Sequence, residues 1–103
     1  NFRSAYLWYL RAAELGHINA SYRLARLLEE GKGVAQDYKE AAKWYLQAAN
    51  NGHMQAAGYY GIIIYEGKGG VEEDKTQGLE LIRKSANVGI PEFRKYLDEH
   101  RMK

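Results

Sequence analysis

The sequence contains no cysteine, which excludes disulfide bonds and thiolate metal sites in a chain of 103 residues. An excess of one charge is also missing, since 15 basic and 13 acidic residues leave a net charge of +2. So small a charge creates no large field of one sign, which argues against nucleic acid or an anionic membrane as the main partner.

Long apolar segments are absent as well. The longest, residues 56–65, is too short to span a bilayer and contains Gly58 and Gly61, so we expect no membrane insertion. No signal peptide is visible, although a chain that begins at Asn1 is expected to be a fragment or a processed form. The compartment stays open between the cytoplasm and the envelope or periplasm.

The dominant feature of the sequence is an internal repeat. Residues 5–13 match residues 41–49 at a shift of 36, and Gly-His and Gly-Lys-Gly pairs follow at the same shift. A third copy matches at a shift of 37, because GKGG at 67–70 is one residue longer than GKG at 31–33. Several independent matches at one spacing indicate a repeat architecture.

Within each copy, apolar residues recur at the three- and four-residue spacing of amphipathic helices. Glycines stand where helices should end, Asp37 and Asp74 stand at cap positions, and Pro91 stands at a helix start. The predicted helices span residues 2–15, 18–30, 38–50, 54–66, 75–88 and 91–101.

This pattern predicts an all-α solenoid of antiparallel helix pairs, in one domain over residues 1–103 and with about two and a half repeats. Stable arrays usually need at least about three repeats. We therefore expect the chain to belong to a longer repeat protein, or its ends to be covered by a partner or by self-association.

The repeat resembles a known family. From residue 20 to residue 52 it runs A-x3-LA-x2-L-x2-G-x-GV-x2-D-x3-A-x2-WY-x2-AA-x2-G. This run resembles the Sel-one-like repeat (SLR), a relative of the tetratricopeptide repeat. The resemblance implies a right-handed α/α superhelix whose first-type helices line the concave side. In the last copy Trp-Tyr becomes Leu81-Ile82 and Ala41 becomes Gly78, changes that keep these positions apolar.

Most residues that suggest chemistry have a structural explanation. Trp8 and Trp44 share a repeat position and are predicted to lie in the core. The GKG and GKGG segments follow helices and lack the strand and Lys-Ser/Thr of a phosphate loop, so they are predicted turns. His17 and His53 match because of the duplication, and we predict no metal and no cofactor.

Paired carboxylates carry no predicted chemistry either. Glu29 and Glu30 follow Arg26, and ordinary surface pairing with that arginine is the expected role of both. No nucleophile with a supporting base can be assembled from the sequence, so we predict that the chain is not an enzyme.

One face of the first-type helices is unusual for a solvated surface. Tyr59, Ile62 and Tyr65 recur at i, i+3 and i+6, opposite the predicted packing stripe. Surfaces enriched in tyrosine and arginine have the composition of binding hot spots. The alternative is that the tyrosines pack laterally between neighbouring helices. The predicted partner-binding residues on the concave face are Tyr22, Arg23, Arg26, Tyr59, Ile62, Tyr65, Lys95 and Tyr96.

The predicted function is a protein-interaction scaffold or adaptor that binds a peptide or a partner helix along this face. Proteins of the resembled family act as adaptors in envelope biology, secretion and protein quality control. One alternative is binding or hydrolysis of β-lactams, as in some cysteine-rich relatives, although this chain has no cysteine. Another is self-assembly, in which open repeat ends stack into a homodimer.

Overall fold

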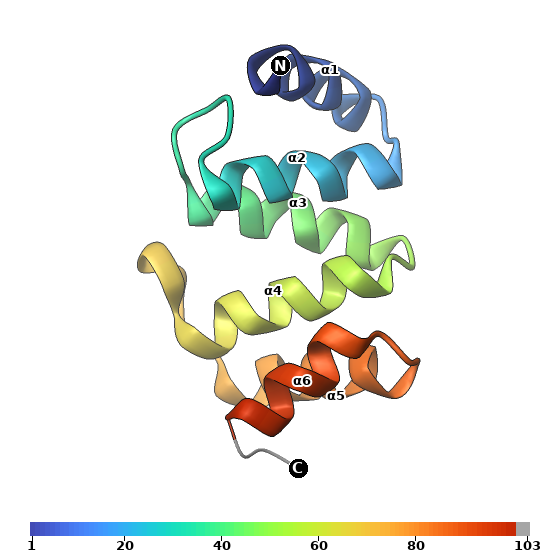
Figure 1. Ribbon diagram of the computed structural model, residues 1–103, viewed down its shortest axis with the longest axis vertical. Coiled ribbons are helices and arrows are strands. Elements are labelled where there is room, and N and C mark those ends of the chain that lie inside the picture. The colour runs from blue at the N-terminus through green and yellow to red at the C-terminus, as the bar shows by residue number, and fades with distance from the viewer. Residues whose placement is uncertain (101–103) are drawn as a thin grey trace.

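The computed structural model describes residues 1–100, which form six α-helices, one short 3-10 helix and no strand (Figure 1). The elements are α1 (Phe2–Glu14), α2 (Ile18–Glu30), α3 (Tyr38–Asn50), α4 (Met54–Glu66), η1 (Lys68–Gly70), α5 (Lys75–Asn87) and α6 (Pro91–Glu99). The predicted boundaries are confirmed to within one residue for the first five α-helices. The last helix ends at Glu99, before the predicted end at residue 101, which lies outside the described residues.

The caps that the sequence predicts explain where the helices begin and end. The carboxylates of Asp37 and Asp74 each accept a backbone N–H of the first turn at 3.0 Å. Gly31 and Gly67 end α2 and α4 at φ values of 69° and 64°, a left-handed conformation that favours glycine. Pro91 occupies the first turn of α6, where its missing N–H costs no hydrogen bond.

Successive helices stack along the longest dimension of the molecule, with α1 at one end and the α5–α6 pair at the other (Figure 1). The described chain measures 39 × 26 × 21 Å along its principal axes. Each helix packs mainly against the helices before and after it. This is the arrangement of a superhelical array of antiparallel helix pairs.

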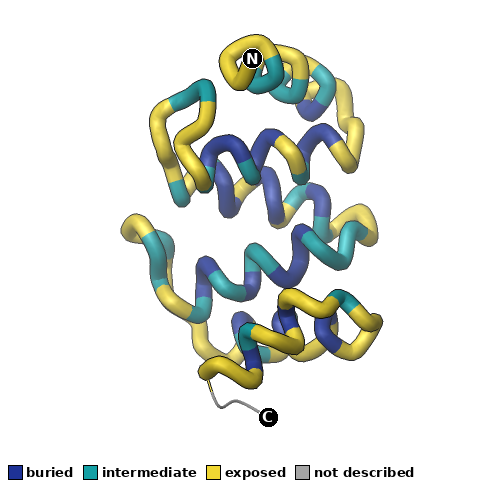
Figure 2. Tube along the Cα trace, viewed as in Figure 1, coloured by how far each residue is buried: buried dark blue, intermediate teal, exposed yellow. Residues whose placement is uncertain are grey.

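The core lies between these helices in two clusters. The larger one joins α2, α3 and α4 and includes the fully buried Leu24, Tyr45 and Ile63. The smaller one centres on Ile82, Phe93 and other residues of α5 and α6. Figure 2 shows buried segments concentrated in the middle of the stack, whereas α1 is mostly exposed or intermediate.

The last repeat packs more tightly than the preceding one. At the α4–α5 contact, a Cβ added to Gly78 would lie 2.7 Å from the carbonyl oxygen of Gly61. The matching residues at the α2–α3 contact are the buried Ala25 and Ala41. The change from alanine to glycine therefore does more than keep the position apolar, because it lets two backbones approach.

The prediction that both tryptophans lie in the core is wrong for one of them. Trp44 is 8% exposed, but Trp8 is 73% exposed. Helix α3 lies between α2 and α4, whereas α1 packs against α2 alone. Trp8 therefore carries the same repeat signature as Trp44 without a helix to cover it.

Candidate protein-interaction surface

Five aromatic side chains from α2, α3, α4 and α6 meet in what we call the aromatic cluster. Its rings belong to Tyr22, Tyr45, His53, Tyr59 and Phe93. The Tyr22 ring stacks on the His53 ring at a centroid distance of 4.4 Å, and Tyr59 lies 5.7 Å from Tyr45 and 5.0 Å from Phe93. The cluster thus ties α2, α3 and α6 to α4.

The local sequence of α4 prepares the seat for the Tyr22 ring. His53 caps this helix, and its Nδ1 accepts the backbone N–H of Ala56 at 3.1 Å. His53, Ala56 and Tyr59 recur at i, i+3 and i+6 and so share one helix face. The small, fully buried Ala56 leaves room for the Tyr22 ring between its two larger neighbours.

The next interface fills the same space from the opposite side. Repeat shifts of 36 and 37 match Tyr22 to Gly58, and Ala56 to Phe93. A Cβ added to Gly58 would overlap the Phe93 ring, so the large residue now comes from the later helix and the small one from the earlier helix. The two interfaces therefore keep one large and one small partner, but exchange their places.

Carboxylates accept the tyrosine hydroxyls of this face. The hydroxyl of buried Tyr45 donates to Glu29 Oε1 at 2.5 Å, and the hydroxyl of Tyr59 donates to Glu92. Glu30 pairs with Arg26 at 3.3 Å as expected. The expected pairing of Glu29 with that arginine is wrong, because Glu29 faces α3 instead.

These contacts keep the hydroxyls protonated. Burial, followed by the nearby charge of Glu29, raises the pKa of Tyr45 above its usual value. Burial and the hydrogen bond to Glu92 raise the pKa of Tyr59 in the same way. At any pH near neutrality the tyrosines are therefore neutral donors, which suits a recognition surface better than acid–base catalysis.

Three of the predicted site residues come together. The Arg26 guanidinium lies 4.6 Å from the centre of the Tyr59 ring, and Tyr22 lies 6.2 Å from the same ring. All three side chains are half-buried. Arg23, next to them on α2, is exposed.

The other predicted residues lie elsewhere on the array. Ile62, Tyr65 and Tyr96 pack against the smaller core cluster, and the exposed Lys95 lies on α6. The Lys75 ammonium sits 4.3 Å above the Tyr65 ring, so that ring faces α5. The strip formed by Tyr59, Ile62 and Tyr65 is thus divided between two interfaces, in agreement with the lateral-packing alternative.

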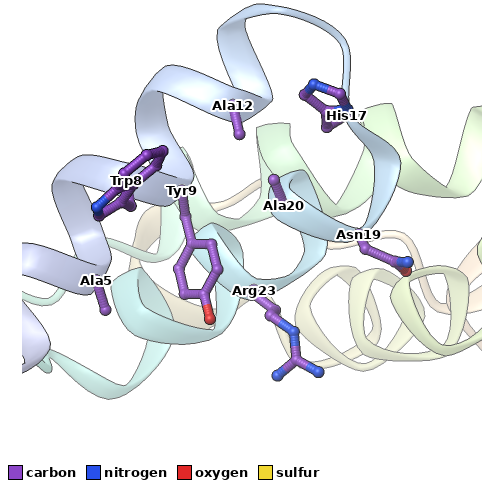
Figure 3. A pocket seen from close by; sticks show the side chains of 8 residues that line it. All are labelled: Ala5, Trp8, Tyr9, Ala12, His17, Asn19, Ala20 and Arg23. Atoms are coloured by element: carbon purple, nitrogen blue, oxygen red, sulfur yellow. The ribbon is translucent and has the colours of Figure 1, made fainter.

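A pocket that the sequence did not reveal lies between α1 and α2 (Figure 3). We call it the N-terminal slot. It measures about 460 Å³ and is lined by Ala5, Trp8, Tyr9, Ala12, His17, Asn19, Ala20 and Arg23. The prediction that Trp8 lies in the core concealed it, although the unmatched first half-repeat was a signal that could have disclosed it.

The described residues offer little for catalysis. Both buried serines donate to backbone carbonyls, Ser21 to His17 at 3.1 Å and Ser85 to Met54 at 2.8 Å. Within residues 1–100, no three potential ligands gather to hold a metal ion. None of the helices in that range has the length and apolar character to cross a bilayer.

Comparison with solved structures gives the same fold. The chain superimposes with a TM-score of 0.80 on a Sel1 repeat protein from Oxalobacter formigenes, at 33% identity, covering 90% of this chain and 38% of that one. A protective antigen of uropathogenic Escherichia coli with an SLR fold, c5321, gives 0.79 at 36% identity and coverages of 89% and 20%. Cysteine-rich protein B of Helicobacter pylori gives 0.78 at 26% identity and coverages of 94% and 72%.

The chain therefore spans well under half the length of the first two of these structures. No curated protein sequence matches it. The family model described as Sel1 repeat matches residues 1–17, 18–53 and 55–89, which together account for most of the chain. Sel1 repeat proteins are generally non-catalytic scaffolds for protein interactions, and by these matches the chain belongs to the Sel1 repeat family.

Proposed function

We propose that this chain is a protein-interaction scaffold that binds a peptide or a partner helix across α2, α4 and α6, the helices that line the concave side in the resembled superhelix. The observation that carries the proposal is the grouping of Tyr22, Arg26 and Tyr59 on this face. Tyrosine and arginine are the residues most enriched in binding hot spots.

The contacts of the aromatic cluster support this role. The rings of Tyr22 and Tyr59 are held by lateral neighbours yet keep part of their surface exposed. Side chains that are already ordered lose little conformational entropy when a partner binds. In this proposal Tyr22, Arg26 and Tyr59 form the centre of the site, and Arg23, Lys95 and Tyr96 lie toward its rim. Ile62 and Tyr65 then act mainly by supporting α4.

The bound segment should carry carboxylates. Arg23, Arg26 and Lys95 give the face three cationic side chains on α2 and α6. Arg26 is already shared with Glu30 at 3.3 Å, so a carboxylate of the partner would compete with that exposed ion pair. Such a pair contributes at most about 1 kcal/mol, which makes the exchange easy.

A selection from a displayed peptide library against the whole chain tests the proposal. Selected peptides should bind an Arg26→Ala variant at least about tenfold more weakly than the parent. Arg83→Ala, at an exposed position of α5, is the matched control and should change nothing. Equal binding by the parent and the Arg26→Ala variant, with both folded, would place the site elsewhere.

We also propose that the chain is not an enzyme. Its buried serine hydroxyls are committed to backbone carbonyls, and the chain has no cysteine. Incubation with a β-lactam followed by intact-mass measurement should give no covalent adduct and no hydrolysis of the drug. A stoichiometric adduct would instead support the enzyme alternative.

A further inference from the structure

The N-terminal slot repeats, residue by residue, a surface that is covered in the interior of the array. A shift of 36 converts its eight residues into Ala41, Trp44, Tyr45, Ala48, His53, Gln55, Ala56 and Tyr59. The apolar members of that second set are buried in the larger core cluster or packed against it. Since α2 packs against α3 in that interior interface, the slot has the lining of a helix-docking surface.

The interior interface also shows what kind of side chain fits. There the Tyr22 ring stacks on His53 at 4.4 Å, lies 6.0 Å from Tyr45, and finds room above Ala56. The slot offers the same three residue types at matching positions, namely His17, Tyr9 and Ala20 (Figure 3). An aromatic side chain from a docking helix can therefore enter the slot as Tyr22 enters the interior.

The slot differs from the interior surface in one charge. One turn after Tyr22, the guanidinium of Arg26 lies 4.6 Å from the Tyr59 ring. The slot residue that matches Tyr59 is Arg23, which is exposed and takes part in no ion pair within residues 1–100. A docking helix with arginine at this point would meet a like charge, whereas a carboxylate would meet an opposite one.

The apolar area beside the slot is wider than stacking within the array requires. Leu7, next to Trp8, is 51% exposed. Its interior counterpart is Lys43, an exposed residue whose ammonium lies 5.8 Å from the Trp44 ring. Leucine at a position that the repeat can leave to lysine suggests a partner with a broad apolar face.

We propose that the N-terminal slot is a second docking site, independent of the α2–α4–α6 face. Its ligand is an amphipathic helix with an aromatic residue at the position of Tyr22 and a carboxylate four residues later. A second copy stacked head to tail does not fit, because α6 carries Lys95 at the position that matches Tyr22.

Peptides based on α2 itself provide the probes. The first has the sequence of residues 18–30 with Arg26→Glu, and is kept helical by a staple on the face opposite Tyr22. The second adds Tyr22→Ala to the first, and the third is the unsubstituted sequence with the same staple. None contains tryptophan, so the emission of the exposed Trp8 reports occupancy of the slot, while buried Trp44 gives a constant background.

The first peptide should shift the Trp8 emission to shorter wavelength in a saturable manner. The second should bind at least about tenfold more weakly, since it lacks the aromatic anchor. The third should bind at least about threefold more weakly to the parent, and an Arg23→Glu variant should reverse the order of the first and third peptides. A Trp8→Phe variant should lose the spectral shift but retain binding by calorimetry.

Three results would overturn the proposal. One is the absence of a Trp8 shift with every peptide, and another is equal affinity of the first two peptides. The third is a doubling of molecular mass with rising protein concentration, accompanied by the same Trp8 shift without peptide. That result would put a second copy of the chain in the slot. Melting curves check that the Arg23→Glu variant is folded.

Discussion

The helix pairs α1–α2 and α3–α4 carry the same residue types at matching positions, but only the second pair is enclosed. Tyr9 is half-buried where Tyr45 is fully buried, and Ala12 is partly exposed where Ala48 is not. The difference comes from neighbours, since α1 packs against α2 alone. One repeat signature can therefore encode core packing in one place and an accessible apolar surface in another.

The strongest test of this comparison is to truncate the matching tryptophans. Trp44→Ala should lower the free energy of unfolding by about 3–5 kcal/mol, because it leaves a cavity in the core. Trp8→Ala should change it by no more than about 0.5 kcal/mol, as expected for an exposed side chain. Urea denaturation of both variants measures the difference.

Lys43→Ala, an exposed change beside Trp44, serves as the control and should also stay within about 0.5 kcal/mol of the parent. Equal destabilisation by the two tryptophan variants would mean that Trp8 is covered in solution, for example by a second copy of the chain.

A smaller effect is expected at the close contact between α4 and α5. Gly78→Ala should destabilise the chain by about 1–3 kcal/mol, because the new methyl group would meet backbone atoms of Gly61 and Tyr65 that cannot move independently. Thr76→Ala, at an exposed position of the same helix, controls for helix propensity and should be close to neutral. Thermal melts measure both, and a stabilising Gly78→Ala would show that the two helices can separate at no cost.

The matching tyrosines should differ by less than the tryptophans. Tyr45→Phe removes the hydrogen bond to half-buried Glu29 and should cost about 1–2 kcal/mol. Tyr9→Phe should be neutral to within about 0.5 kcal/mol, because within residues 1–100 the Tyr9 hydroxyl has no hydrogen-bond partner. Chemical denaturation at neutral pH gives both values. If Tyr45→Phe were as neutral as Tyr9→Phe, Glu29 would be solvated well enough to need no partner.

The smallest effect concerns pH. Burial lowers the pKa of His53 from its usual 6.5, and the charge of Arg23 on α2 acts in the same direction. The unfolded chain therefore binds this proton more readily than the folded one. The contribution of His53 to stability is fully present above pH 6.5 and is lost as the pH falls below that value.

Melting temperatures of the parent and of His53→Asn, measured from pH 7.5 down to pH 5, test this expectation. Asparagine keeps an N-cap acceptor but does not titrate, so the variant should lose less stability on acidification. His17→Asn, the matching change at an exposed cap, should follow the parent curve. A parent and a His53→Asn variant with parallel curves would contradict the assignment.

The helices were predictable because their signals are local. Cap residues such as Asp37, glycines that accept a left-handed backbone, and apolar residues at helical spacing act within a few positions of one another. The repeat then supplied the pairing of the helices, since each unit contacts only its neighbours. The resemblance to the family was carried by the same short-range spacing.

The candidate surface was only partly predictable. The sequence singled out Tyr22, Arg26 and Tyr59, which meet, but it also grouped Tyr59 with Tyr65, which faces α5. Helical spacing tells which residues share a face of one helix, but not which neighbouring helix covers each part of that face.

The sequence by itself thus determined the all-α repeat, its helix boundaries and the identity of most core positions, because these depend on contacts within a helix or between identical units. Only the tertiary structure decided that Trp8 is exposed, that Glu29 accepts the Tyr45 hydroxyl, and that Phe93 takes over from Tyr22 the task of filling the interface. Those outcomes depend on which helix lies next to each residue, and identical repeats do not have identical neighbours.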